Sequence, residues 1–156
     1  SREIVRECTA RSVKISTAES CTGGMISGAV TSISGSSAVI ELGVCSYSNR
    51  IKHEILHVPA EVLKQFTEYS VECAAEMAKG VMELSGADYG VSTTGVAGPT
   101  GGSAEHPVGE VCIAVSGRNG CRSERFLFAQ GSADREVIRA LAAEKALSML
   151  LCEIKK

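Results

Sequence analysis

The sequence contains no tryptophan, and aromatic residues make up only 4% of its 156 residues. A binding pocket in this chain is therefore not built mainly from aromatic rings. Basic residues are not in excess either, because the formal net charge is −2. Proteins that hold nucleic acid usually present a basic surface to the phosphates, so we expect no direct contact with nucleic acid.

Long apolar runs are absent as well. No stretch is long enough to span a bilayer, and the first residues, SREIVREC, lack the apolar segment of a signal peptide. Seven cysteines are present, an odd number, and no two are spaced as CxxC. These features favour free, mostly buried thiols in a reducing compartment. We therefore expect a cytoplasmic protein without a membrane partner.

The apolar fraction of 44% and the charged fraction of 22% are typical of a globular chain. Apolar residues at helical spacing predict helices near 4–8, 25–33, 48–57, 60–66 and 70–85, and a last helix from about Ala133. Strand-like runs end near Thr17 and Tyr47 and cover 89–93, 108–116 and 122–128. We expect the last helix to bury Val137, Ala140, Leu141, Leu147, Leu150 and Ile154. This order predicts an α/β fold, a single three-layer α/β/α domain over residues 1–156 with a mixed β-sheet.

The stretch TAESCTGG, residues 17–24, follows the first predicted strand and precedes a helix. A strand end followed by a sharp turn places side chains at the carboxyl edge of a sheet, where ligands bind in open α/β folds. The start of the helix offers unpaired N–H groups that suit an oxyanion or a phosphate. The other interpretation is that Ser20 or Thr22 simply caps the helix.

A second candidate site is the glycine-rich stretch TTGVAGPTGGSAEHPVGEV, residues 93–111. Five glycines fall between Gly95 and Gly109, and they expose backbone N–H groups to which a phosphate or another anion can bind. The stretch is not a Walker A loop, since no Gly-Lys-Ser/Thr follows, and it is not a dinucleotide fingerprint, since a strand comes next. The other interpretation is a tight connection between strands.

These two stretches, with YSNRIK at residues 47–52 between them, form an ordered set. The set resembles the CinA C-terminal domain family, whose stand-alone members are nicotinamide-nucleotide amidohydrolases. The resemblance covers nearly the whole chain. It implies hydrolysis of the amide of nicotinamide mononucleotide, a small-molecule nucleotide, to nicotinic acid mononucleotide and ammonia, without a metal or a cofactor. Larger members carry an additional N-terminal nucleotide-binding domain, so the chain is either a stand-alone enzyme or one domain of a longer protein.

The resemblance also assigns site residues. It implies Ser20 of AESCTGG as the nucleophile, Lys52 of YSNRIK as its partner, and Tyr47 as a member of the same site. An arginine that opens the last helix is associated with the site, and Arg135 is the candidate. Typical members read GDR there, whereas GSADR at 131–135 is two residues longer, which leaves the placement of Arg135 open. The substrate-binding candidates in the two loops are Thr22, Gly23, Gly24, Thr94, Gly95, Gly98, Gly101, Gly102 and Ser103.

Amide hydrolysis needs a nucleophile, a base, an oxyanion site and a proton for the leaving amine. The chain has three histidines, and only His106 lies in these stretches, so a Ser-Lys pair is the natural arrangement. Lys52 must be neutral to take the serine proton. Its burial would lower its pKa, and so would a nearby cation such as Arg50 or Arg135. Tyr47 could relay the proton or orient the lysine amine.

Three other features of the sequence could suggest a different chemistry. Cys21 is a possible nucleophile, but no histidine is placed to pair with it. Glu19 could act as a base or orient a neighbour. The stretch HEILH, residues 53–57, matches the zinc-protease pattern, but Pro59 ends its helix and no third ligand is evident, so we expect no metal site.

The alternative function is a non-catalytic nucleotide- or partner-binding module linked to competence and the DNA-damage response. A module that only binds has no need of a base, so the combination of Ser20, Tyr47 and Lys52 favours the enzyme. We also expect a homo-oligomer, with a dimer favoured.

Overall fold

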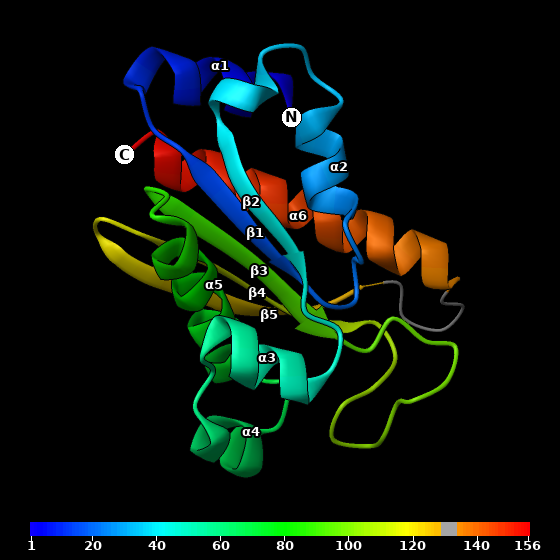
Figure 1. The fold of residues 1–156 in the computed structure, drawn as a ribbon. Helices are drawn as coiled ribbons and strands as arrows, with labels where there is room; N and C mark the ends of the chain where they lie inside the picture. The colour runs from blue at the N-terminus through cyan, green and yellow to red at the C-terminus, as the bar shows by residue number, and fades with distance from the viewer. Residues whose placement is uncertain (129–133) are drawn as a thin grey trace.

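The computed structural model describes residues 1–128 and 134–156 (Figure 1). The helices are α1 (Arg2–Arg11), α2 (Met25–Thr31), the 3₁₀ turn η1 (Ser36–Ala38), α3 (Asn49–Leu56), α4 (Ala60–Phe66), α5 (Val71–Ser85) and α6 (Arg135–Ile154). The strands are β1 (Ile15–Glu19), β2 (Ile40–Cys45), β3 (Tyr89–Gly95), β4 (Glu110–Gly117) and β5 (Gly120–Leu127). Ala133, where the sequence predicts the last helix to begin, lies outside the described residues.

The five strands form one sheet in the order β2-β1-β3-β4-β5. β1 runs parallel to β2 and β3, whereas β4 is antiparallel to both β3 and β5. Helices α1, α2 and α6 cover one face of the sheet, and α3, α4 and α5 lie on the other (Figure 1). The predicted α/β/α layering and mixed sheet are therefore confirmed. Because β1, β2 and β3 are parallel, the loops that follow them meet at one edge.

The described helices are amphipathic or short, and none of them is long and apolar enough to cross a bilayer. The longest, α6, differs from the expectation in its buried face. Val137 and Leu141 are 47% and 37% exposed and Ala140 is exposed as well, so the prediction that these three point inward is wrong, whereas Leu150 and Ile154 are buried as predicted. The buried face also contains Ala142, Ala143 and Ala146, whose small side chains allow a close approach to β3 and β4.

The position of α3 depends on a glycine in α5. Ser48 caps α3, its hydroxyl accepting a hydrogen bond from the amide of Ile51 at 3.3 Å. The other end of α3 lies directly on α5, where a Cβ atom added at Gly80 would stand 1.9 Å from the carbonyl oxygen of Leu56. Only a residue without a side chain fits there. Gly80 thus brings α3, which carries Lys52, against the end of the sheet.

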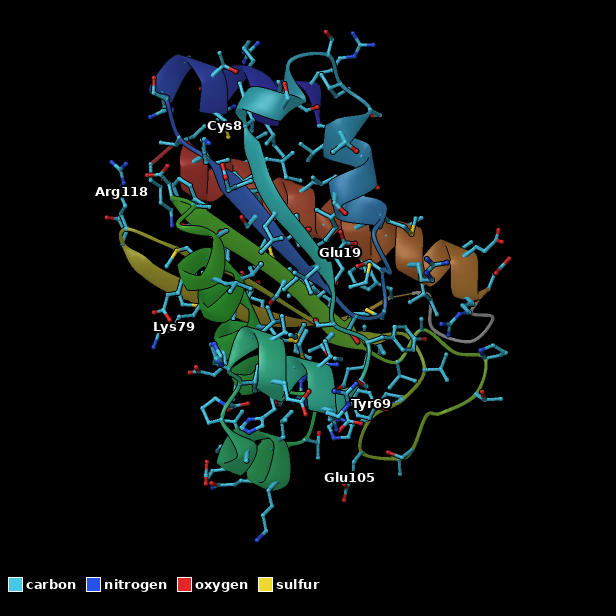
Figure 2. All side chains as sticks on the ribbon, viewed as in Figure 1. Cys8, Glu19, Tyr69, Lys79, Glu105 and Arg118 are labelled. Carbon is cyan, nitrogen blue, oxygen red and sulfur yellow. The ribbon has the colours of Figure 1, made fainter. Side chains whose placement is uncertain are left out.

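A buried carboxylate fixes the turn between β1 and α2. Glu19 ends β1 and is fully buried (Figure 2). Its two oxygens accept hydrogen bonds from the backbone amides of Gly24, Ile26 and Ser27 at 2.8 to 3.0 Å. The hydroxyls of Thr22 and Ser27 also donate to it, at 2.8 and 2.9 Å. The carboxylate therefore satisfies the first amides of the helix, and the helix dipole favours its charge.

We predict that Glu19→Gln lowers the free energy of unfolding by about 3 kcal/mol, because an amide nitrogen then faces backbone N–H donors in a buried site. Urea denaturation measures the change. Glu41→Gln is the matched control, since Glu41 forms only an exposed ion pair with Lys14 and its replacement should cost less than about 1 kcal/mol. Equal, small losses in both variants would contradict the role assigned to Glu19.

Candidate active site

One pocket of about 310 Å³ opens at the edge of the sheet where the parallel strands end. Five of the residues that the sequence assigns to a site line it, namely Ser20, Tyr47, Lys52, Gly95 and Arg135. They come from the loops after β1 and β2, from α3, from the end of β3 and from the start of α6. The topology therefore brings together side chains that lie as many as 115 positions apart, from 20 to 135, in the sequence.

Ser20 and Lys52 lie in hydrogen-bond contact. The Nζ atom of Lys52 is 3.2 Å from the Oγ atom of Ser20. The same nitrogen donates to the carbonyl oxygen of Ser46 at 3.0 Å. Lys52 is only 1% exposed and Ser20 only 8%. A lysine so placed can exchange a proton with the serine hydroxyl, which is the geometry that general-base activation of a nucleophile requires.

Burial lowers the pKa of Lys52 from its ordinary value, because the protein interior penalises the charged amine. Electrostatic interactions with Cys73, Glu68 and Cys21 act in the opposite direction and raise that pKa. Arg50 gives no help, since it pairs with Glu54 along the exposed side of α3. Desolvation, and not a neighbouring cation, is thus the cause that moves Lys52 toward its neutral form.

Arg135 reaches the pocket, which answers the question left by the longer GSADR stretch. One guanidinium nitrogen donates to the carbonyl oxygen of Gly98 at 2.6 Å, and another to the hydroxyl of Tyr47 at 3.0 Å. Tyr47 is 63% exposed, and its hydroxyl contacts Arg135 and not Lys52. It is the carbonyl oxygen of Tyr47, at 3.5 Å, that faces the lysine amine. The structure thus places Tyr47 at the rim and leaves no direct relay through its phenol.

Cys21 follows Ser20 and lines the same pocket, but burial raises the pKa of its thiol to about 11. The thiol stays protonated near neutral pH and is a poor nucleophile. The backbone amides of Cys21 and Thr22 donate to no oxygen within the described part of the chain. Two such donors beside a nucleophile suit an oxyanion. All seven cysteines are free, and four of them, Cys8, Cys21, Cys73 and Cys112, are buried.

Arg139 positions the turn after Ser20, although the sequence did not single it out. Its guanidinium donates to the carbonyl oxygens of Cys21 and Thr22 at 3.1 and 2.9 Å, whereas Glu19 accepts from the amides that follow. The signal for it is its spacing, since it lies four residues after Arg135 and therefore on the same face of α6.

The expected anion site at the start of α2 is already occupied by the protein. Thr22 is fully buried, and its hydroxyl contacts Glu19 and Thr93 at 2.8 and 2.7 Å. The amide of Gly24 donates to Glu19, as do the next helical amides. Thr22, Gly23 and Gly24 do not line the pocket. Their expected contact with substrate phosphate is therefore corrected, because the carboxylate of Glu19 takes the donors that a phosphate would need.

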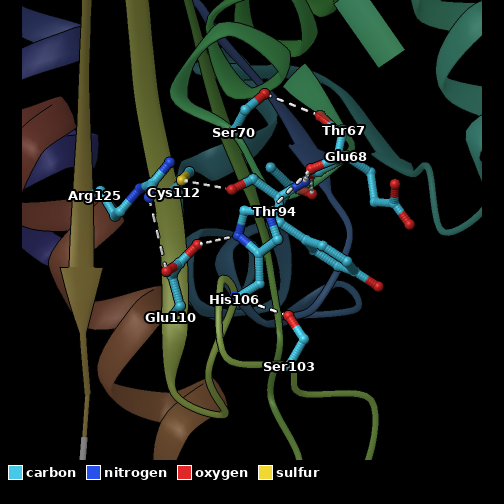
Figure 3. A network of polar contacts seen from close by, with 10 residues as sticks. Thr67, Glu68, Ser70, Thr94, Ser103, His106, Glu110, Cys112 and Arg125 are labelled. Carbon is cyan, nitrogen blue, oxygen red and sulfur yellow. Dashed lines mark hydrogen bonds and ion pairs between the residues drawn. The ribbon is translucent and has the colours of Figure 1, made fainter. Parts of the chain in front are cut away.

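The glycine-rich loop contributes through its ends. Gly95 lines the pocket, the carbonyl of Gly98 holds Arg135, and the hydroxyl of Thr94 donates to the carbonyl oxygen of Glu68 at 2.6 Å. Gly101, Gly102 and Ser103 are exposed and do not line the pocket. Ser103 instead accepts a hydrogen bond from the amide of His106 at 3.0 Å, within the loop itself (Figure 3). These three residues thus shape the loop without touching the pocket.

A second part of the wall comes from residues that the sequence did not single out. These are Ser48, Asn49, Glu68, Tyr69 and Ala97. Glu68 and Tyr69 precede Ser70, the N-cap of α5, whose hydroxyl accepts from the amide of Cys73. The sequence predicts a helix from about residue 70, but nothing local in it shows that the two residues before that helix line the pocket.

The HEILH stretch does not form a sustained helix. α3 ends at Leu56, and His57 adopts a left-handed conformation with φ of 57°. The Nδ1 atom of His53 lies 2.8 Å from the carbonyl oxygen of Val58. No three metal-binding side chains of the His, Cys, Asp or Glu type are grouped together in the part of the chain that the structure describes.

Two named proteins are similar to this chain in sequence. The CinA-like protein of Geotalea daltonii is 46% identical over 140 residues, which cover 90% of this chain and 33% of that protein. The nicotinamide-nucleotide amidohydrolase PncC of Enterobacter agglomerans is 46% identical over 144 residues, 91% of this chain and 85% of that protein. This chain spans about a third of the length of the CinA-like relatives that it matches first.

Solved structures agree with this relationship. The competence/damage inducible protein CihA from Agrobacterium tumefaciens superimposes with a TM-score of 0.94 at 41% identity, over 99% of this chain and 93% of that chain. A CinA superfamily protein from Klebsiella pneumoniae 700603 gives 0.92 at 32% identity, over 99% and 94% of the two chains. The family model of the CinA C-terminal domain matches residues 1–154, and the chain belongs to that family.

Proposed function

We propose that the chain hydrolyses the carboxamide of nicotinamide mononucleotide to give nicotinic acid mononucleotide and ammonia. The observation that carries the proposal is the buried amine of Lys52, 3.2 Å from the hydroxyl of Ser20, in a pocket at the sheet edge. The relative named PncC supports the reaction class, since it is 46% identical and aligned over 85% of its length. A module that only binds a nucleotide gives no reason to bury a lysine beside a serine.

In the first half of the reaction, neutral Lys52 takes the proton from Ser20 as the hydroxyl oxygen attacks the amide carbon. We assign the stabilisation of the negative charge on the amide oxygen to the backbone amides of Cys21 and Thr22, which follow Ser20 and donate to no backbone oxygen among the described residues. Protonated Lys52 then gives its proton to the departing amine, the carbon–nitrogen bond breaks and ammonia leaves. An ester between Ser20 and the nicotinoyl group remains.

In the second half, Lys52 is again neutral and takes a proton from a water molecule that attacks the ester. The bond to Ser20 breaks, the serine oxygen recovers its proton from Lys52, and nicotinic acid mononucleotide leaves. The step consumes one water and needs no oxidant, reductant or metal.

Arg135 is the group that we assign to the phosphate. A guanidinium binds phosphate oxygens in a bidentate manner, and Arg135 forms no ion pair with another described side chain. Its two hydrogen bonds, to Gly98 and Tyr47, leave other donors available. A pocket of about 310 Å³ is near the small end of the range for ligand sites and suits a mononucleotide.

We predict that Ser20→Ala abolishes ammonia release from nicotinamide mononucleotide, because the attacking oxygen is gone. The fall in kcat should exceed about a thousandfold, as expected for loss of a nucleophile. A coupled ammonia assay measures it, with circular dichroism to confirm the fold. Cys21→Ser is the control and should retain most of the activity. Activity of Ser20→Ala near that of the parent would eliminate Ser20 as the nucleophile.

We also predict that Lys52→Arg loses nearly all kcat although it keeps a positive charge, because a guanidinium cannot give up its proton near neutral pH. In the parent, kcat should fall as the pH drops through the lowered pKa of Lys52, since only the neutral amine is a base. Steady-state kinetics from pH 6 to 10 test both points. If kcat of Lys52→Arg stays high and only KM rises, Lys52 binds phosphate and is not the base.

Burial of Lys52 predicts a dependence of stability on pH. Its pKa is lower in the folded than in the unfolded chain, so between the two values the unfolded chain binds more protons and stability rises with pH. Lys52→Met removes this contribution. The free energy of unfolding of the parent, minus that of Lys52→Met, should therefore increase as the pH rises from the lowered pKa of Lys52 toward the ordinary pKa of lysine, about 10.4. Urea denaturation at several pH values measures this, and a difference that is constant or falls with pH would refute it.

A further inference from the structure

The wall formed by Glu68 and Tyr69 is held from behind by buried groups of the sheet. The hydroxyl of Thr94 donates to the carbonyl oxygen of Glu68 at 2.6 Å, and the thiol of Cys112 donates to that of Tyr69 at 3.4 Å. The amide of Tyr69 donates to the hydroxyl of Thr67 at 3.2 Å. The backbone of this corner before α5 is thus fixed by β3 and β4 (Figure 3). Both residues also line the pocket.

The ring of Tyr69 is held as well. It lies against the imidazole of His106, with ring centroids 5.4 Å apart and planes inclined at 53°. His106 is in turn fixed by Glu110, whose oxygen lies 2.8 Å from its Nδ1 atom. Burial, followed by the charge of Glu68, raises the pKa of Tyr69, so its phenol stays neutral. Tyr69, which lines the pocket, is therefore held in a fixed place by these contacts.

Glu68 is an unpaired charge in the wall. No lysine, arginine or histidine nitrogen lies within ion-pair distance of its carboxylate among residues 1–128 and 134–156. Figure 3 shows the carboxylate directed away from the network of His106, Glu110 and Arg125. Arg135, also without an ion pair in this part of the chain, lines the same pocket. Beside the buried amine of Lys52, the pocket therefore carries opposite charges at Glu68 and Arg135, and neither forms an ion pair among the described residues.

We propose that Glu68 and Tyr69 recognise the positive charge of an N-substituted pyridinium ring, so that the pocket selects a dipolar substrate with a cationic ring and an anionic phosphate. This inference rests on the proposed function and names the feature of the substrate that the site reads. The quaternary ring nitrogen attracts a carboxylate, and a cation also binds over the face of an aromatic ring. The anionic end of the same molecule then lies toward Arg135.

The arrangement separates the nucleotide from molecules with a neutral ring. Free nicotinamide and a mononucleotide with a reduced, dihydropyridine ring carry the same carboxamide but no ring charge. Neither gains from Glu68, and both should bind more weakly. The other role open to Glu68 is indirect, because its charge raises the pKa of Lys52. That role would change catalysis without distinguishing a charged ring from a neutral one.

The test measures binding apart from turnover. Calorimetry at pH 8 with Ser20→Ala gives the Kd of nicotinamide mononucleotide and of its 1,4-dihydro form, which differ in the charge of the ring. The ratio of the two Kd values is then measured in double variants, which combine Ser20→Ala with Glu68→Gln, with Tyr69→Leu or with the control substitution Glu61→Gln. Glu61 is an exposed residue of α4 outside the pocket, so the ratio should not change with Glu61→Gln.

We expect Ser20→Ala to prefer the oxidised ring, and the preference to fall roughly fivefold with Glu68→Gln and by a similar factor with Tyr69→Leu. Glu68→Gln keeps the shape of the side chain, so the test does not depend on Tyr69→Leu folding. An unchanged ratio in Glu68→Gln, or equal weakening of both ligands, would overturn the inference. If the ratio behaves as expected but the parent releases no ammonia, the inference holds as a binding preference and the proposed function fails.

Discussion

The burial of the Lys52 amine is the constraint around which the site is arranged. An isolated charged amine in a protein interior is unfavourable, so the group shifts its pKa and becomes neutral more readily. The chain gives the amine one good acceptor, the carbonyl of Ser46, and the hydroxyl of Ser20. Among the described residues, Ser46 Oγ is a buried side-chain oxygen without a hydrogen-bond partner, so polar groups around the lysine are not all satisfied. Incomplete satisfaction of this kind is typical of places that serve function and not stability.

Two buried ionisable residues, Glu19 behind the pocket and Lys52 within it, are stabilised in opposite ways. Glu19 receives hydrogen bonds from three backbone amides and two hydroxyls, and the start of α2 supplies the compensating dipole. Five hydrogen bonds of this kind hold the carboxylate in one place. Lys52 lacks such compensation, and burial depresses its pKa. The first residue fixes the turn that carries Ser20, and the second is left able to exchange a proton with it.

The sequence allowed some residues of the pocket to be predicted, but not the contacts that surround them. Ser20 and Lys52 belong to short stretches whose residue types are informative, and the parallel order of β1, β2 and β3 brings these stretches to one edge. The role of Glu19 could not be settled, because a carboxylate that caps a helix from the preceding strand looks the same in sequence as a catalytic acid. The amides at the start of α2 were expected to bind phosphate, because the sequence does not show that the carboxylate of Glu19 already accepts from them. Long-range contacts such as those of Arg139, and of Glu68 and Tyr69, leave only weak local signals.

Helix α6 shows how packing decides which side chains reach the site. Its buried face combines three alanines, Ala142, Ala143 and Ala146, with the larger side chains of Ile138, Met149, Leu150 and Ile154. Val137 and Leu141 lie outside this face and are exposed. The same orientation of the helix directs Arg139 to the turn after Ser20 and Arg135 to the rim of the pocket. A larger side chain at these alanines would move both arginines together, so the core face of α6 and the binding face of the pocket are set by one choice of residue size.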